Sequence, residues 1–242
     1  MSGVKTIRII RSKLVSFAFC FEELTVLDQI ATNLRIKICG VTRLDQAEAI
    51  AQMGATAIGF ICVPDSPRYV SPAQIRSIIE QLETPIDRVG VFANESIDSI
   101  VSIVEKTDLN VVQLHGNETP EFCEKLRSHL AKIELIKAFR IRSADQLAEV
   151  LLYQDCVDTF LLDAYSPHAL GGTGHTIDWK ILQNVGFDRP WFLAGGITPD
   201  NVLAALILKP NGIDLSSGVE IAPGNKDLTK VKQLFDQLNY SG

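Results

Sequence analysis

A cysteine and an aspartate each stand at the end of a short apolar stretch, where the acid and the base of an active site are expected. Cys39 lies near the end of the stretch 36–40, and Asp163 lies near the end of the stretch 159–164. A thiolate can remove a proton and a protonated carboxyl can donate one, provided that the pKa of each is shifted toward working pH. The two residues are therefore candidates for a proton-transfer pair.

Each member of this pair also has a structural alternative. Cys39 could be a small buried hydrophobe, since free cysteine is among the most buried residue types. Asp163 could be the ion-pair partner of a lysine such as Lys37 or Lys137. Barrel folds and open α/β folds both place their chemistry at the carboxyl ends of strands, which favours the catalytic interpretation of Asp163. For Cys39 position alone leaves the two interpretations even, and the residues that follow in the chain favour catalysis.

Three glycine-bearing stretches later in the chain predict a phosphate site. Glycine lets backbone N–H groups approach phosphate oxygens, and a helix amino terminus adds a favourable partial charge. Any one of these glycines could simply form a tight turn, but three sets after consecutive predicted strands favour phosphate binding. The residues are Gly172, Thr173 and Gly174, then Gly195 and Gly196, and finally Asp214, Ser216, Ser217 and Gly218.

Arg68 and His115 complete the set of residues that could do chemistry. Arg68 lies in a loop with Pro64 and Pro67, and a guanidinium matches a planar carboxylate, although a solvated surface arginine is the alternative. His115 could polarise a group in the site or be a hydrogen-bonded core histidine. The other histidines show no metal-ligand spacing with Cys, Asp or Glu, so the sequence predicts no metal site.

Eight apolar stretches alternate with amphipathic segments from residue 35 onward, which predicts an α/β fold, a single (β/α)8 TIM barrel. An open doubly wound sheet is the alternative, but no G-x-G-x-x-G follows the first strand. Helix starts are predicted at Thr42, Ser71, Ser143 and Thr198. The predicted strands are 36–40, 57–63, 88–93, 111–115, 135–139, 159–164, 191–195 and 213–216.

The composition argues against a protein that binds nucleic acid and against one that spans a membrane. The 242 residues carry a formal net charge of -6, which argues against a surface that binds nucleic acid. No apolar run is long enough to span a membrane. Five cysteines without a C-x-x-C pair indicate reduced thiols, so we expect a cytoplasmic protein.

Residues 1–34 do not share the pattern of the barrel. We interpret them as a poorly ordered extension, or as the result of an upstream start codon, with a targeting segment as the alternative. The predicted domain division is therefore an extension over 1–34 and a barrel over 35–242.

Nine motifs occur in order over almost all of residues 35–242. They are K-I-C-G at 37–40, S-P-R-Y-V at 66–70, G-V-F at 90–92, V-Q-L-H-G at 112–116, L-D at 162–163, G-G-T-G at 171–174 with D-W at 178–179, L-A-G-G at 193–196, D-L-S-S-G-V-E at 214–220, and P-G at 223–224 with K-D at 226–227. Taken together, these motifs resemble those of the phosphoribosylanthranilate isomerase family of tryptophan biosynthesis.

The resemblance implies an Amadori rearrangement of a phosphorylated small-molecule substrate, without cofactor or metal. It implies that Asp163 protonates the furanose ring oxygen, that Cys39 removes the C2′ proton, and that Arg68 holds the anthranilate carboxylate. Backbone groups around 172–174, 195–196 and 217–218 would hold the phosphate. Mesophilic members of the family are usually monomeric, so a monomer is expected.

Two alternatives remain open from the sequence. One is an enzyme similar to indole-glycerol-phosphate synthase, which carries an extra segment before its first strand but relies on lysine and glutamate at its strand ends. The other is a phosphate-binding barrel without catalysis, against which the presence of both Cys39 and Asp163 argues.

Overall fold

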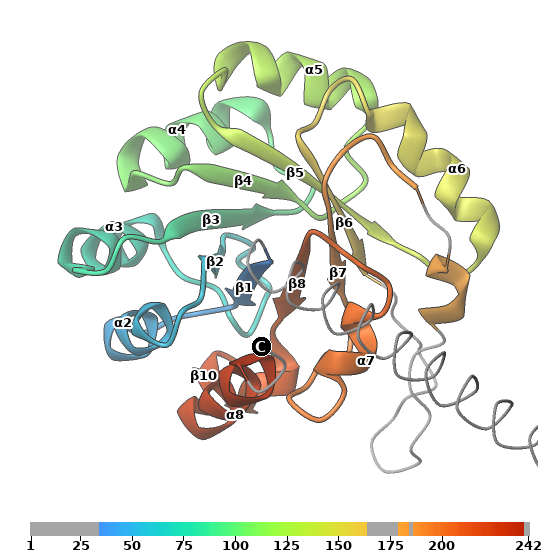
Figure 1. Ribbon diagram of the computed structural model, residues 1–242. Helices are drawn as coiled ribbons and strands as arrows, with labels where there is room; N and C mark the ends of the chain where they lie inside the picture. Colours follow the sequence, from blue (N-terminus) through green and yellow to red (C-terminus); the bar gives the residue numbers. More distant parts are fainter. Residues whose placement is uncertain (1–33, 164–178, 184–185, 240–242) are drawn as a thin grey trace, which may run out of the picture.

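The computed structural model of the protein describes residues 34–163, 179–183 and 186–239. Eight parallel strands follow one another around a closed barrel in chain order, and β1 pairs with β8 (Figure 1). This confirms the predicted (β/α)8 barrel, and every strand end lies within two residues of its prediction. The strands are β1 Arg35–Cys39, β2 Ala57–Ile61, β3 Asp87–Phe92, β4 Val111–Leu114, β5 Glu134–Arg140, β6 Thr159–Asp163, β7 Trp191–Ala194 and β8 Gly212–Leu215.

Helices surround the barrel on its outer side (Figure 1). Their apolar faces pack on the strands, because apolar side chains recur at helical spacing. The α-helices are α2 Leu44–Gln52, α3 Pro72–Gln81, α4 Ile97–Thr107, α5 Pro120–His129, α6 Leu147–Val150, α7 Val202–Leu206 and α8 Leu228–Asn239. The 3-10 helices are η1 Ala144–Gln146, η2 Leu151–Tyr153, η3 Trp179–Leu182 and η4 Ser217–Val219.

Two of the four predicted helix starts are confirmed. Ser71 caps α3 in a capping box with Gln74, and Ser143 forms the corresponding box before η1. The start predicted at Thr42 is wrong, because α2 begins at Leu44 and the Thr42 hydroxyl instead donates to the carbonyl of Gly224. The start predicted at Thr198 is also wrong, because its backbone N–H bonds the Asn201 side chain in a turn and α7 begins at Val202.

The core has two layers because successive side chains of a strand point to opposite faces of the sheet. The larger layer lies between the strands and the helices and is built from branched and aromatic side chains. The smaller layer fills the inside of the barrel, where short side chains predominate. Its buried members are Cys39, Ala57, Val89, Val91, Val111, Ile136, Ala138, Leu161, Phe192 and Ala194.

A charged cluster closes the amino-terminal end of the barrel. Arg35 on β1 forms a two-pronged ion pair with Glu134 on β5, with nitrogen–oxygen distances of 2.6 and 2.8 Å, and also contacts Asp87 on β3 at 3.1 Å. Thr159 donates to Glu134, and the Arg35 guanidinium lies over the ring of Phe192. This end of the barrel is therefore filled by a structural cluster that lies away from the mouth.

The carboxyl-terminal part of the chain crosses the junction between β1 and β8. A short hairpin of β9 Glu220–Ala222 and β10 Asn225–Lys226 follows β8. The fully buried Lys226 donates to the backbone carbonyls of Cys39 on β1 and of Ser216 after β8. The hairpin thus joins the two strands at which the barrel closes.

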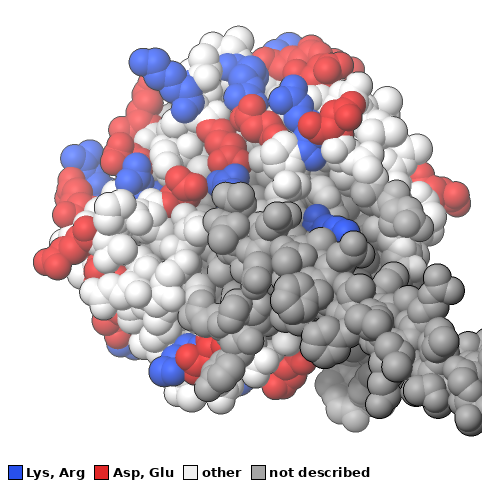
Figure 2. Space-filling model, in the orientation of Figure 1, with Lys and Arg blue, Asp and Glu red and all other residues white. Residues whose placement is uncertain are grey.

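The described surface carries charges of both signs. On the face shown in Figure 2, acidic and basic side chains are interspersed rather than gathered into a patch of one sign. No helix within the described ranges combines the length and the apolar character needed to cross a membrane. Residues 1–33 lie outside those ranges, so the predicted division between an extension over 1–34 and a barrel over 35–242 stays a prediction.

Candidate active site

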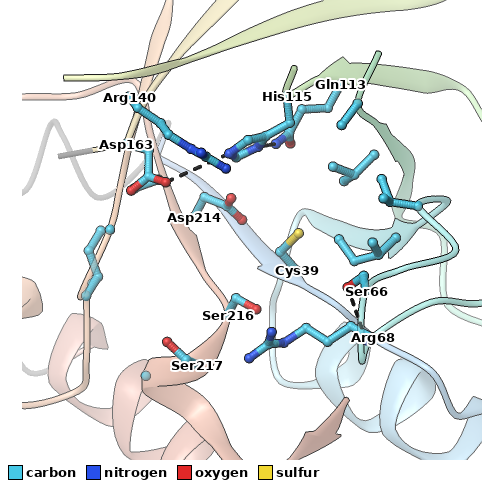
Figure 3. A pocket seen from close by; sticks show the side chains of 18 of the residues that line it. Cys39, Ser66, Arg68, Gln113, His115, Arg140, Asp163, Asp214, Ser216 and Ser217 are labelled. Atoms are coloured by element: carbon cyan, nitrogen blue, oxygen red, sulfur yellow. Dashed lines mark hydrogen bonds and ion pairs between the residues drawn. The ribbon is translucent and has the colours of Figure 1, made fainter. Parts of the chain in front are cut away.

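The mouth of the barrel, at the carboxyl ends of the strands, holds a cavity of about 580 Å³ (Figure 3). The structure brings ten of the predicted site residues together around it. Gly172, Thr173 and Gly174 lie outside the described residues, so their predicted part in phosphate binding is not tested. The ten residues are Cys39, Arg68, His115, Asp163, Gly195, Gly196, Asp214, Ser216, Ser217 and Gly218.

Cys39 ends β1 with its side chain inside the barrel, next to a buried ion pair. Lys37, one inward position earlier on the same strand, donates to Asp214 Oδ1 on β8 at 2.9 Å. Burial raises the pKa of the Cys39 thiol, the Lys37 ammonium opposes this rise, and Asp214 adds to it. Burial would lower the pKa of Lys37, but Asp214 and the Cys39 thiol hold it above its ordinary value. A charged ammonium is thus kept beside the sulfur.

A glycine on the neighbouring strand makes room for this arrangement. Gly59 on β2 stands beside Cys39 in the register of the two strands. A methyl group at Gly59 would lie 2.8 Å from Cys39 Sγ and 3.2 Å from Lys37 Nζ, which is closer than such atoms pack. Glycine at position 59 therefore leaves room for the thiol and the ammonium, and the side chain of any other residue there would take that space.

Asp163 ends β6, and β7 and β8 lie between it and β1 around the barrel wall. Its carboxyl is partly exposed to the cavity, and Oδ2 lies 3.8 Å from Nε2 of His115. The alternative that Asp163 is paired with Lys37 or Lys137 is wrong, because Lys37 pairs with Asp214 and Lys137 pairs with Glu118. Figure 3 shows Asp163 and Cys39 directed into the same cavity.

His115 follows β4 and lines the cavity, so it is not a core histidine. Its Nδ1 lies 2.9 Å from the Nε2 of Gln113, a buried residue on the same strand. The ring therefore stands between a buried amide on one side and the Asp163 carboxyl on the other.

Arg68 reaches the cavity from the loop after β2 and is not a solvated surface arginine. Glu220 holds one edge of its guanidinium through two nitrogens, with Nε–Oε1 at 3.0 Å and Nη2–Oε2 at 2.6 Å. Lys226 donates to the same carboxylate at 2.7 Å. Burial would raise the pKa of Glu220, but the hydrogen bonds from Arg68 and Lys226 hold it below its ordinary range. The arginine is thus fixed in position with its Nη1 atom not engaged by Glu220.

Glycines after β7 and β8 form a backbone cradle at the edge of the cavity. Gly195 and Gly196 have φ of 91° and 66°, which L-residues with a side chain rarely adopt. Gly218 lies within η4, and a Cβ atom there would overlap the carbonyl oxygen of Ile197. The chain can therefore pass close to a bound group and present its N–H groups to an anion.

The wall between Arg68 and His115 is apolar. It is formed by side chains at the ends of β2 and β3, and such a surface suits a flat hydrophobic group. The residues that form it are Ile61, Val63, Val91 and Ala93.

Sequence reasoning missed three polar residues of the cavity: Ser66 in the loop after β2, and two strand residues, Gln113 and Arg140. Arg140 ends β5 opposite Asp163 in the register of β5 and β6 and makes no ion pair within the described residues. The signal for both strand residues was present in the alternation of the strands. Gln113 is a polar residue in an otherwise apolar stretch, and Arg140 falls two positions after the inward-facing Ala138.

The comparisons with known proteins agree with this geometry. The profile of the N-(5'phosphoribosyl)anthranilate (PRA) isomerase family matches residues 36–237. The chain belongs to the phosphoribosylanthranilate isomerase family. The N-(5'-phosphoribosyl)anthranilate isomerase of Rippkaea orientalis is 58% identical over 206 residues, which cover 85% of this chain and 96% of the relative. The family predicted from the nine motifs is therefore confirmed.

Solved structures of the phosphoribosylanthranilate isomerase family share the fold. The enzyme from Thermotoga maritima is 37% identical and superimposes with a TM-score of 0.77, covering 86% of this chain and 99% of that one. A phosphoribosyl anthranilate isomerase in complex with reduced 1-(o-carboxyphenylamino)-1-deoxyribulose 5-phosphate is 34% identical, with a TM-score of 0.72 and coverage of 86% and 99%. The alternative of an indole-glycerol-phosphate synthase is set aside.

Within the described residues, no three His, Cys, Asp or Glu side chains are grouped so that they could hold a metal ion. The four cysteines in those ranges, Cys39, Cys62, Cys123 and Cys156, are free thiols.

Proposed function

We propose that the protein catalyses the Amadori rearrangement of N-(5-phospho-β-D-ribosyl)anthranilate to 1-(2-carboxyphenylamino)-1-deoxy-D-ribulose 5-phosphate in tryptophan biosynthesis, with Asp163 as general acid and Cys39 as general base. The roles of Asp163 and Cys39 are assigned because the groups that the reaction needs line a single cavity. A carboxyl, a thiol, a fixed arginine and a backbone anion cradle all line it.

Binding uses two groups of residues in the cavity. The phosphate lies at the N–H groups around Gly195, Gly196 and Gly218, and the anthranilate carboxylate lies at Arg68. The aromatic ring then rests on the apolar wall between Arg68 and His115. These contacts place the ribose between Asp163 and Cys39, which converts the two proton transfers into steps within one complex.

The first step opens the sugar ring. Asp163, in its protonated form, donates to the ring oxygen as the bond from that oxygen to C1′ breaks, and the lone pair on the anthranilate nitrogen forms a Schiff base. The carboxylate that results lies beside Nε2 of His115.

The second step removes the C2′ proton. The Cys39 thiolate takes this proton, and the electrons of the C–H bond move toward the nitrogen to give an enolamine. The enolamine becomes the ketone by gaining a proton at C1′ and losing one from the 2′-hydroxyl. The enzyme ends with its proton on sulfur rather than on the carboxyl, and exchange through water restores the starting state.

Two variants test this assignment. Substrate is generated from anthranilate and phosphoribosyl pyrophosphate by the upstream transferase, and the loss of anthranilate fluorescence is followed. We expect Cys39→Ala and Asp163→Asn each to lower kcat by about 100-fold or more while substrate is still bound. Unchanged turnover in both variants would overturn the mechanism. No turnover in the wild-type protein would favour the phosphate-binding barrel without catalysis.

We further infer a monomer in the cytoplasm. Free thiols at the four described cysteines and the composition support a reducing compartment. Sedimentation of the purified full-length chain tests the oligomeric state, and a concentration-independent mass of twice that of the chain would contradict it.

A further inference from the structure

Gln113 is a polar side chain placed in the interior of the barrel, where its neighbours on β4 are apolar. It is 1% exposed and lines the cavity, and its Nε2 lies 2.9 Å from Nδ1 of His115 two residues later. Residues two apart on a strand share a face, so this contact follows directly from the alternation of β4. The amide and the imidazole are therefore held side by side by the backbone itself.

The chemistry of the amide decides where the imidazole proton lies. When Gln113 Nε2 donates, Nδ1 of His115 is an acceptor and a neutral ring carries its proton on Nε2. The reversed amide would bring its oxygen to Nδ1 and leave both amide hydrogens buried without an acceptor. Among the described residues, the observed orientation leaves the carbonyl oxygen and one N–H hydrogen without a partner, whereas the reversed one leaves two N–H hydrogens without a partner, which is the rarer defect in buried groups.

The far side of the imidazole faces the proposed acid. Nε2 of His115 lies 3.8 Å from Oδ2 of Asp163, at the edge of the cavity (Figure 3). With its proton on Nε2, the ring carries its partial positive charge on the side of this oxygen and acts on it electrostatically, because 3.8 Å is too long for a hydrogen bond. The opposite tautomer would point a lone pair at the carboxylate and repel the charge that forms there.

We propose that Gln113 is a positioning residue that sets the tautomer of His115, so that the Nε2–H group stabilises the Asp163 carboxylate after its proton has passed to the ring oxygen. This inference rests on the proposed function, because it assumes that Asp163 is the acid. Gln113 makes no bond to the reacting atoms and acts only through His115.

The remaining end of the amide supports a functional role rather than a purely structural one. Gln113 Oε1 is buried and has no hydrogen-bond partner within the described residues. A glutamine kept only for stability would be expected to satisfy both ends or to be replaced by an apolar residue of similar size. The unpaired oxygen lowers the stability of the protein, and a glutamine is nevertheless suited to this position if its N–H group is needed to orient His115.

The first test needs no substitution. Long-range nitrogen-15 NMR of the full-length wild-type protein, with His115 assigned by comparison with His115→Asn, reports which ring nitrogen carries the proton. We expect the proton on Nε2 in the neutral ring. A proton on Nδ1 would overturn the proposal, whatever the activity of the enzyme.

The second test uses Gln113→Leu and Gln113→Glu. The glutamate accepts from Nδ1–H and should move the proton of the neutral ring to Nδ1, whereas the leucine removes the donor and with it the orientation that Gln113 imposes on the ring. We expect kcat to fall by about 10- to 100-fold with KM within about 3-fold. Thr107→Val, a buried polar residue of α4 that bonds Ile103, is the matched control and should keep both constants. Unchanged kcat in either folded Gln113 variant would overturn the proposal.

The roles of Cys39 and Asp163 and the role of Gln113 can fail separately. If Cys39→Ala and Asp163→Asn keep their turnover while the wild-type His115 carries its proton on Nε2, the proposed mechanism fails and the tautomer stands. If both variants are inactive and the proton is on Nδ1, the mechanism stands and the role of Gln113 is overturned.

Discussion

The ammonium of Lys37 donates to Asp214 at 2.9 Å while it lies beside the thiol of Cys39. The two charges have opposite effects on the sulfur. Lys37 lowers the pKa of Cys39, Asp214 raises it, and burial raises it more than either changes it. The pKa of the thiol therefore lies above its ordinary value. The reactive thiolate is therefore formed more readily as the pH rises.

Lys37→Met should raise the pKa of Cys39 further, and Asp214→Asn should lower it. The acid limb of kcat/KM is then expected to move to higher pH in the first variant and to lower pH in the second. The rate at which iodoacetamide alkylates the Cys39 peptide, followed by mass spectrometry against pH, checks the same shift without turnover. Shifts in the same direction for both variants would contradict this account.

Glu220→Gln should weaken substrate binding more than chemistry. The substitution keeps the shape of the side chain but removes the charge that fixes the Arg68 guanidinium through Nε and Nη2. We expect KM to rise by about 10-fold, with a smaller change in kcat. Glu80→Gln, at an exposed ion pair with Arg76 on α3, is the matched control, and an equal effect in the two variants would rule out a role in fixing Arg68.

Gly59→Ala should abolish most activity without unfolding the barrel. The added methyl group would lie 2.8 Å from Cys39 Sγ, so the thiol must leave its position. We expect kcat/KM to fall by about 100-fold, since small misplacements at a reacting centre have effects of this size. Gly186→Ala, where the methyl group meets nothing within 4 Å, should match the wild type, and a fully active Gly59→Ala would show that Sγ is free to move.

Arg35→Met should lower stability but not activity. It removes the cation that joins Glu134 and Asp87 at the end of the barrel away from the site, and leaves partly buried carboxylates unpaired. We expect the free energy of unfolding, measured in urea, to fall by about 2–4 kcal/mol with kcat unchanged. Arg43→Met removes an exposed pair with Asp45 and should cost about 0.5 kcal/mol or less. A similar loss in both variants would contradict the structural role of the cluster.

The strands and the main site residues were accessible from the sequence, because each signal is local. An apolar stretch with a cysteine or an aspartate at its end predicts a strand whose last residue reaches the barrel mouth, and Cys39 and Asp163 follow that rule. The two helix starts that were predicted wrongly show the limit. Thr42 and Thr198 have the right residue types, but distant Gly224 and nearby Asn201 take their hydrogen bonds.

The supporting contacts could not be predicted, because they join parts of the chain that are far apart. The sequence offers Lys37 as a possible partner of Asp163, and only the closure of β1 on β8 gives it to Asp214. Glu220 and Lys226 belong to a motif, but their contacts with Arg68 and with the backbone at Cys39 depend on the folded hairpin. Gln113 carried a readable signal, a polar residue within an apolar strand.

The junction that Lys226 makes with β1 also sets an order of events during protein synthesis. Cys39 and Lys226 are 187 positions apart, so at common translation rates the cysteine leaves the ribosome on the order of 10 s or more before its neighbours are made. The buried surroundings of the thiol are complete only when Asp214 on the last strand and Lys226 on the hairpin have been made.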